Sequence, residues 1–340
     1  MQEAWDLLAK AFQLDLERLQ REWRRDATEI RMGIGRPIRV RKGGAEGFLL
    51  QNGHVDTNGR GAYFRPDQTW LEKGLDRLVH YSLYAYEGQM GQGFLTVEGG
   101  HRIGVCGRAV VENGVIRTLT DISALVMRMA HEVKGCSEAV FPYIRKGRRV
   151  CHTLILSPPG VGKTTMLRDL LRRCSDELML QVGIVDERSE IAACRKGIPQ
   201  MDVGLRTEVL DGAPKIAGIR MLLRSVAPEV IGVDEIGSRA EADALGEMMR
   251  CGVQVLCTAH ACSVEEALGR EEIESLYRRG MIERMVVLAD EPGRGRVREI
   301  RDGKGRCLYA AVADSGRGTA DFGRLDGGTT CCGTVWHSSG

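Results

Sequence analysis

The spacing of hydrophobic and polar positions changes near residue 130, and the change divides the chain into two parts. In the first part, apolar residues recur at helical spacing over residues 4–24, which predicts an amphipathic helix. Apolar and charged residues then alternate over 28–44, which predicts strands with Pro37 at an edge or a turn. A second helix is predicted over 70–87.

Three further strands are predicted over residues 93–120. They alternate in polarity and are separated by Glu-Gly-Gly at 98–100 and by Asn-Gly at 113–114, a pair that tight hairpin turns prefer. Helices and antiparallel strands together predict an α+β domain over residues 1–130. We expect it to serve as a docking or assembly module.

In the second part, short apolar runs alternate with helical patterns. The apolar runs lie at 151–157, 178–186, 229–235 and 253–260, and the helical patterns at 163–174, 213–226 and 238–250. Apolar runs of this kind are typical of strands buried on both faces of a parallel sheet with helices on each side. The pattern therefore predicts an α/β domain.

The end of the chain has a different texture. Segments 281–289 and 296–311 predict closing strands and a hairpin, so the α/β domain is expected over residues 131–313. Residues 314–340 are rich in Gly, Ser and Thr without apolar periodicity, which predicts a disordered tail.

Composition and charge narrow the class of protein. The chain has 340 residues with 48 Lys and Arg against 46 Asp and Glu. Because these charges nearly cancel, the net charge does not favour binding to nucleic acid or to anionic membranes. The 11 cysteines are scattered without regular spacing, which is typical of free thiols in a reducing cytosol. The charged N-terminus resembles neither a signal peptide nor a membrane span, so a cytoplasmic protein is expected, with any membrane contact peripheral.

The segment SPPGVGKTT at 157–165 predicts a phosphate-binding loop that runs from a strand into a helix. Ser157 stands where the usual pattern opens with glycine, a slot that starts the turn and accepts a small residue. Backbone N–H groups would hold the phosphates, Lys163 would reach the outer phosphates, and the Thr164 hydroxyl would ligate Mg²⁺. The predicted ATP-binding residues are Ser157, Pro158, Pro159, Gly160, Val161, Gly162, Lys163, Thr164 and Thr165.

The strand EVIGVDE at 229–235 ends in two carboxylates, as the second half of such a site requires. Asp234 would hold Mg²⁺ directly or through water, and Glu235 would orient and deprotonate the attacking water. A second carboxylate directly after the metal ligand favours hydrolysis over transfer to another substrate. The pair therefore predicts an ATPase rather than a kinase.

Two other groups of residues complete the predicted site. Thr258 and His260 end the next apolar run and are candidates for sensing the γ-phosphate, although Thr258 is as well suited to capping. An arginine, often donated by a neighbouring subunit, stabilises charge on a transferred phosphoryl group. Arg188 and Arg206 are candidates for this role, and Arg220 and Arg224 are favoured.

With these residues in place, the chain resembles the stage III sporulation protein AA ATPases of endospore-forming bacteria, which are relatives of the hexameric type II and type IV secretion and pilus motors. The resemblance spans about residues 28–311. It depends on the ordered strings GGHRIGVCGRAV, SPPGVGKTTMLRDLLR, VDERSEIAA, DVGLRTEVLDGAPK, IRMLLRSVAPEVIGVDEIG and TAHA.

The resemblance implies a P-loop NTPase domain of the RecA/AAA+ type that works as a homo-oligomer, a hexameric ring in the related motors. It also implies a cytoplasmic ATPase of the mother cell that docks on membrane proteins of a channel between mother cell and forespore and energises it. The serine at 157 is similar to the loop of that family.

Two other functions stay open at this point. A nucleic-acid motor of the recombinase or helicase type would need basic loops or stacking aromatics facing a channel, and only a few arginine clusters support it. A scaffold that binds nucleotide without hydrolysing it is the other alternative. Intact Lys163, Asp234 and Glu235 argue against the scaffold.

Overall fold

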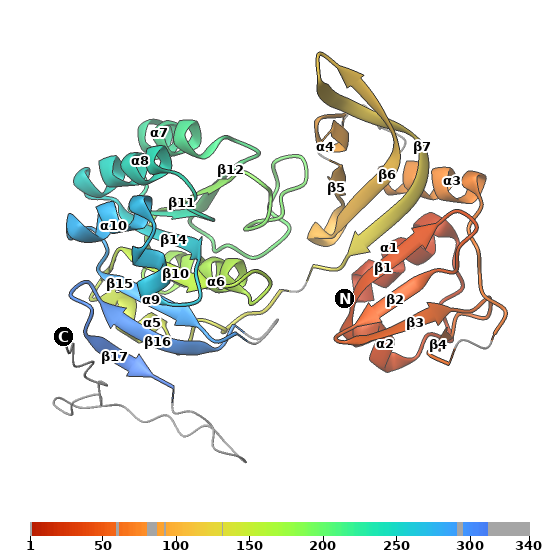
Figure 1. Ribbon diagram of the computed structural model, residues 1–340, viewed down its shortest axis with the longest axis horizontal. Helices are drawn as coiled ribbons and strands as arrows, with labels where there is room; N and C mark the ends of the chain where they lie inside the picture. The colour runs from red at the N-terminus through yellow and green to blue at the C-terminus, as the bar shows by residue number, and fades with distance from the viewer. Residues whose placement is uncertain are drawn as a thin grey trace, which may run out of the picture. The chain divides into compact units, whose positions relative to one another are not determined.

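The computed structural model describes residues 2–58, 61–79, 87–91, 93–130, 132–290 and 295–311 (Figure 1). Tertiary contacts divide the chain into two compact units. Unit 1 contains Met1–Lys134 and Ile184–Pro214, and unit 2 contains Gly135–Gly183 and Lys215–Gly340. The predicted tail at 314–340 lies outside the described residues.

Unit 1 is built on a seven-stranded sheet in the order β4-β3-β2-β1-β7-β6-β5, whose reported pairs are antiparallel. Its strands are β1 Ala27–Gly33, β2 Arg39–Lys42, β3 Ala45–Leu49, β4 Val55–Asp56, β5 Phe94–Thr96, β6 Arg102–Glu112 and β7 Val115–Arg128. Its helices are α1 Gln2–Phe12, α2 Arg21–Asp26, α3 Gln68–Leu78, α4 Glu87–Gly91 and the short 3₁₀ turn η2 Glu98–Gly100.

The core of unit 1 follows from the alternation along its strands. Ile30, Val40 and Met127 are buried and alternate with charged neighbours, so one face of the sheet is apolar. Helices α1 and α3 contribute Leu8 and Leu71 to the same hydrophobic cluster. The three strands predicted over 93–120 are confirmed, although β7 continues to 128.

The single helix predicted over 4–24 is wrong. The first helix ends at Phe12, because Gln13 adopts a left-handed backbone with φ 53°, and a second helix begins at Arg21. The helix predicted over 70–87 is also shorter than expected. It begins one residue after Asp67, whose carboxylate accepts a hydrogen bond from the Trp70 N–H at 2.7 Å, and it ends at Leu78.

The second sheet has eight strands in the order β12-β11-β13-β14-β10-β15-β16-β17. Strands β13, β14, β10 and β15 are parallel, whereas β16 and β17 form an antiparallel edge. The strands are β10 Thr153–Ser157, β11 Val182–Asp186, β12 Thr207–Asp211, β13 Val230–Val233, β14 Gln254–His260, β15 Arg284–Leu288, β16 Val297–Asp302 and β17 Cys307–Ala310.

Helices lie on both faces of this sheet. They are α5 Phe141–Ile144, α6 Lys163–Asp176, α7 Lys215–Ser225, α8 Arg239–Arg250, α9 Val264–Leu268 and α10 Glu271–Arg278, with a small hairpin of β8 Arg145–Lys146 and β9 Arg149–Val150. Gly232 in β13 faces Leu171 of α6, whereas Cys257, on the opposite pleat, lines a small cavity with Met249 of α8 and Leu276 of α10. The predicted α/β fold is confirmed, and strand β12 and helices α9 and α10 were not predicted.

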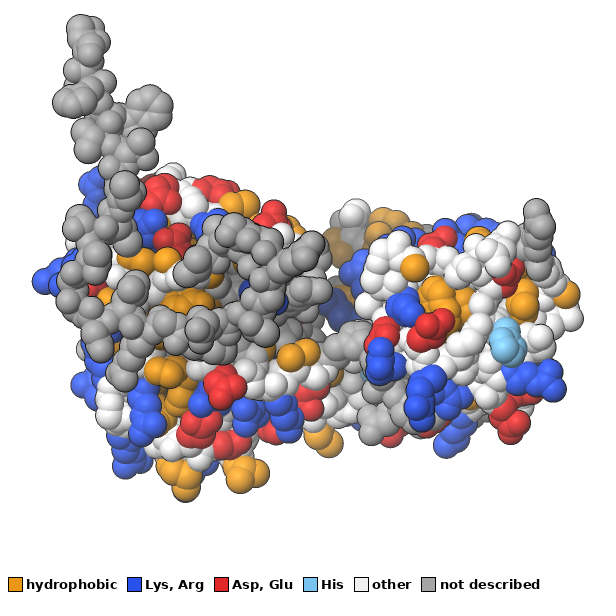
Figure 2. All heavy atoms as spheres, turned by 90° about the horizontal axis from the view of Figure 1, so that it is seen from below, with side chains coloured by type: hydrophobic (Ala, Val, Ile, Leu, Met, Phe, Trp, Pro, Cys, Tyr) orange, Lys and Arg blue, Asp and Glu red, His pale blue; other side chains and the backbone are white. Residues whose placement is uncertain are grey.

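The surface is mixed in charge. Figure 2 shows Lys and Arg side chains interspersed with Asp and Glu over the visible face, in keeping with the formal net charge of +2. In the described part of the chain, no helix is long and apolar enough to cross a membrane.

Candidate functional site

The predicted nucleotide residues of unit 2 meet at one edge of the parallel sheet. Strand β10 lies between β14 and β15, and β13 lies on the other side of β14, so the three strands β13, β14 and β10 are consecutive neighbours. Each of them ends in predicted site residues. Because parallel strands present their carboxyl ends at the same edge, the sheet brings these ends together where α/β proteins bind ligands.

The phosphate loop has the backbone that its glycines allow. Gly160 and Gly162 have φ values of 77° and 115°, a region that side chains disfavour. Gly162 precedes helix α6, and no side chain caps that helix terminus. Ser157 is fully buried, and its hydroxyl donates to the Pro158 carbonyl at 2.8 Å, so the serine fits the opening slot without strain.

Lys163, Glu235 and His260 form one contact cluster. The Lys163 Nζ and the His260 Nε2 each lie 2.9 Å from Glu235 Oε1, and they are 3.4 Å from each other. Lys163 is only 6% exposed, so this ion pair is largely shielded from water. The predicted lysine, general base and sensor are therefore in direct contact.

Asp234 is held between two threonines. The Thr164 hydroxyl donates to Asp234 Oδ2 at 2.6 Å, and the Thr258 hydroxyl donates to Asp234 Oδ1. Thr258 also accepts the Glu235 backbone N–H at 2.8 Å. Thr258 thus links the Asp234 carboxylate and the Glu235 backbone, at the tip of β13, to strand β14.

Glu235 has a backbone that few non-glycine residues adopt, with φ 50°. Its N–H is bound by Thr258, and its carbonyl accepts a hydrogen bond from Lys215 Nζ at 2.6 Å. Lys215 also lies 3.4 Å from Glu241. The sequence interpretation missed Lys215 as a positioning residue, although it ends the string DVGLRTEVLDGAPK.

The two favoured arginines lie on helix α7 and are not part of the contact cluster of Lys163, Glu235 and His260. Arg220 and Arg224 are exposed on helix α7, and Arg220 NH2 pairs with Glu247 of α8 at 3.2 Å. Their role toward a neighbouring subunit stays a prediction.

The string VDERSEIAA forms a tightly held loop after β11. The buried Asp186 carboxylate accepts backbone N–H groups from Glu190, Ile191 and Ala192 at 2.8–3.0 Å. Burial raises the pKa of Asp186, and these N–H donors only partly offset the effect. This aspartate therefore shapes the loop, which explains why the string is acidic at that position.

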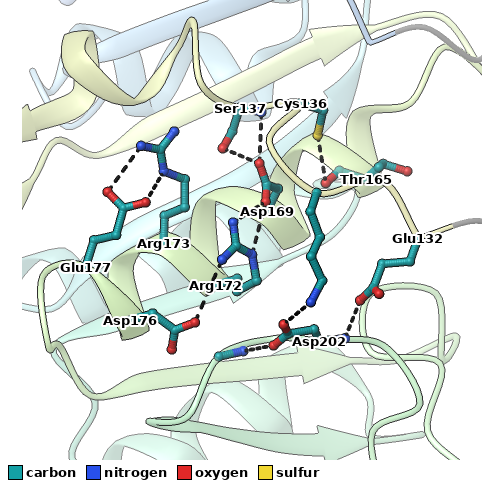
Figure 3. A network of polar contacts seen from close by, with 12 residues as sticks. Glu132, Cys136, Ser137, Thr165, Asp169, Arg172, Arg173, Asp176, Glu177 and Asp202 are labelled. Atoms are coloured by element: carbon teal, nitrogen blue, oxygen red, sulfur yellow. Dashed lines mark hydrogen bonds and ion pairs between the residues drawn. The ribbon is translucent and has the colours of Figure 1, made fainter.

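The helix that follows the phosphate loop also anchors the chain segment before β10 (Figure 3). Asp169 of α6 is buried and accepts both the N–H and the hydroxyl of Ser137, at 3.0 and 2.6 Å. Arg172 NH2 donates to the same carboxylate at 2.8 Å. Burial alone would raise the pKa of Asp169, but these donors outweigh it and lower the pKa.

The residues fit a magnesium nucleotide better than a structural metal. In the described ranges, no group of three or more His, Cys, Asp or Glu side chains is placed to hold a metal ion. Mg²⁺ bound to a nucleotide needs only one or two protein oxygens, because waters and phosphates complete its shell. Thr164 and Asp234 offer two such oxygens 2.6 Å apart.

Comparisons with known proteins agree with this architecture. The stage III sporulation protein AA of Bacillus subtilis (strain 168) is 36% identical over 312 residues, which cover 91% of this chain and 97% of that protein. The pilus retraction motor PilT with bound ADP has a TM-score of 0.52 at 13% identity, over 85% of this chain and 78% of that chain. The Legionella pneumophila ATPase DotB has a TM-score of 0.50 at 17% identity, over 82% and 77%.

The two solved structures show that the chain shares their fold, and the Bacillus relative extends the likeness to the sequence. A family model described as "Sporulation stage III, protein AA" matches residues 1–308, nearly the whole chain. The chain therefore belongs to the sporulation stage III protein AA family.

Proposed function

We propose that this chain binds ATP with Mg²⁺ and hydrolyses it, and that it works as a motor for a membrane complex in sporulation. The observation that carries the proposal is the cluster at the sheet edge, where Glu235 lies 2.9 Å from both Lys163 and His260. A buried lysine at the start of an uncapped helix and two carboxylates at the tip of β13 are what phosphoryl hydrolysis requires.

The residues of the site divide the work among them. The loop N–H groups and Lys163 would bind the phosphates, and Thr164 with Asp234 would hold Mg²⁺. Bound Mg²⁺ would neutralise charge on the phosphate oxygens. Glu235 would take a proton from the water that attacks the γ-phosphorus, and Thr258 and Lys215 would keep its backbone in place.

The contact between Lys163 and Glu235 also suggests an order in which nucleotide binding comes before Glu235 acts as a base. The phosphates would replace Glu235 as the counter-charge of Lys163, which leaves the Glu235 carboxylate beside His260 Nε2. His260 would then report the state of the γ-phosphate along strand β14. The base would become available only when the nucleotide is bound.

Assembly and partners form the remaining part of the proposal. Arg220 or Arg224, exposed on α7, would complete the site of a neighbouring subunit in a homo-oligomeric ring, such as a hexamer. The family to which the chain belongs supports a role in the mother cell, with docking on membrane proteins of a channel to the forespore.

Nucleotide binding tests the proposal directly. Calorimetric titration of the full chain with ATP and Mg²⁺ should show that Lys163→Ala loses binding, whereas Glu235→Gln keeps it. Lys304→Ala, which removes an exposed lysine of the β16–β17 turn, is the matched control and should bind like the natural protein. Binding by Lys163→Ala at the natural affinity would refute the site.

A further inference from the structure

The sheet of unit 1 has one apolar face and one strongly cationic face. On the cationic face, side chains alternate with the buried core positions of β1, β2, β6 and β7. We call it the arginine face, and it consists of Arg31, Arg39, Arg41, Arg102 and Arg128 with the carboxylates Glu29 and Glu46.

The strand register places like charges directly opposite each other. Arg31 is paired with Arg39 across β1 and β2, and Arg102 with Arg128 across β6 and β7. Opposed like charges destabilise a sheet, and residues opposite each other project from the same face. The same register also places opposite charges face to face, with Glu29 opposite Arg41 and Arg128 and Glu46 opposite Arg41, so the face is partly neutralised and keeps an excess of arginines.

A single buried carboxylate organises the centre of the arginine face. The Glu29 side chain is 11% exposed, and its carboxylate lies 2.5 Å from Arg31, 3.7 Å from Arg128 and 4.0 Å from Arg41. The hydrogen bond from Arg31 lowers the pKa of Glu29 despite burial. Glu29 thus stays charged and holds three guanidinium groups in place, while the Arg128 side chain remains 74% exposed.

One end of the arginine face already binds a carboxylate from a distant part of unit 1. Arg102 NH1 lies 2.5 Å from Glu190, a residue of the loop after β11. The loop belongs to an acidic stretch, DERSE at 186–190. This contact shows that an arginine of the face binds a carboxylate from another chain segment.

We propose that the arginine face is a docking surface for an acidic segment of a partner protein. Guanidinium groups recognise carboxylates through paired N–H donors, and a row of them across adjacent strands matches a chain with repeated acidic residues. The surface continues the contact that Glu190 makes with Arg102. Its other arginines outnumber the carboxylates beside them, since Arg31, Arg41 and Arg128 share Glu29, and Arg39 and Arg41 each lie 3.7 Å from Glu46.

The aromatic residues of the same face favour a protein partner over single-stranded nucleic acid. Binding of single strands uses open aromatic faces on which bases stack. Phe94 is covered by the Arg102 guanidinium at 4.0 Å, and Phe48 packs against Tyr63 at 5.4 Å. These rings are occupied within unit 1, so charge is what the face offers.

Fluorescence anisotropy with the full chain tests the proposal. The probe is a labelled peptide of alternating Glu and Ser of about 12 residues, long enough to cross the four arginine-bearing strands, which are spaced at about 4.8 Å. The variant combines Arg39→Ser, Arg41→Ser and Arg128→Ser. The control combines Arg145→Ser, Arg148→Ser and Arg149→Ser, which removes the same charge from exposed positions around the β8–β9 hairpin.

At about 50 mM salt, where screening is weak, the natural chain should bind the peptide. The arginine-face variant should bind at least about tenfold more weakly, and the control within about twofold of the natural chain. Circular dichroism and ATP binding like those of the natural chain show that the variant is folded. Because the arginine face takes no part in ATP binding, a variant that loses the peptide but still binds ATP distinguishes a failure of the docking surface from a failure of the nucleotide site.

Three results would overturn the proposal. One is no measurable binding of the peptide by the natural chain. Another is equal weakening in the variant and the control, which would mean unspecific attraction by net charge. The third is tighter, arginine-dependent binding of oligothymidylate of equal length, which would make the face a nucleic-acid site.

Discussion

At the scale of single residues, the site depends on how Glu235 is held. Its left-handed backbone is disfavoured for a side chain with a Cβ, and contacts on both sides of the peptide offset that cost. Thr258 binds its N–H, and Lys215 binds its carbonyl. The position of the proposed base is therefore set by residues that need not touch the nucleotide.

Thr258→Val tests this dependence. The substitution keeps the shape of the side chain but removes the hydroxyl that joins Asp234 to the Glu235 N–H. Leaving a buried polar group without its partner costs about 1–3 kcal/mol, so we expect a loss in kcat of roughly tenfold to hundredfold with ATP affinity nearly unchanged. Thr258→Ser restores the hydroxyl and should recover most of the rate. A kcat for Thr258→Val equal to that of the natural protein would exclude a positioning role.

The sequence predicted the residues of the site, but it did not predict Lys215, which holds Glu235 in position. Lys163, Thr164, Asp234 and Glu235 follow strands and carry chemistry that local pattern indicates, and the structure brings them together. Lys215 could not be predicted as a support, because its contact with the Glu235 carbonyl joins positions 20 residues apart through the packing of α7.

At the scale of elements, helix α6 joins the phosphate loop to the segment before β10. Its first turn carries Lys163 and Thr164, for which we propose contacts with the phosphates and Mg²⁺, and Asp169, farther along the helix, binds Ser137. The helix was predicted from its apolar spacing, whereas the contact with Ser137 was not, because it depends on where the chain enters unit 2.

Asp169→Asn should lower the free energy of unfolding by roughly 2 kcal/mol at neutral pH. The substitution removes the buried negative charge that accepts hydrogen bonds from Ser137 and Arg172. The lowered pKa of Asp169 means that its ionised form stabilises the folded state above the ordinary aspartate pKa of about 3.9. This contribution is lost as the pH falls through the lowered folded pKa.

Urea unfolding at several pH values measures this effect. The difference between the natural protein and Asp169→Asn should be constant near neutral pH and shrink below about pH 4. Glu177→Gln removes an exposed partner of Arg173 on the same helix and should cost less than about 1 kcal/mol. A pH-independent difference for Asp169→Asn would contradict the assignment.

Errors in predicting elements had local causes. The apolar stripe over 4–24 continues through the break at Gln13, since the residues after the turn also pack into the core of unit 1. The apolar periodicity predicts which residues are buried. It does not predict a residue with left-handed backbone that changes the direction of the chain. Strand β12 was missed because it is only half-buried and lacks the apolar run of the central strands.

At the scale of the whole molecule, the account joins a P-loop fold, membership of the sporulation stage III protein AA family, and two proposed binding surfaces made of residues outside the nucleotide site. We propose that Arg220 and Arg224 on α7 serve a neighbouring subunit, and that the arginine face of unit 1 binds an acidic partner. Both surfaces lie outside what a nucleotide motif predicts, because a motif specifies local chemistry and not assembly.

The most direct test of the central claim is ATP turnover per subunit, measured over a range of protein concentrations for the natural protein and for Glu235→Gln. The account predicts turnover that rises steeply with concentration, since a neighbouring subunit completes the site, and no turnover in the variant although it still binds ATP. Turnover that persists in Glu235→Gln, or that is absent from the natural protein at every concentration while ATP stays bound, would contradict it.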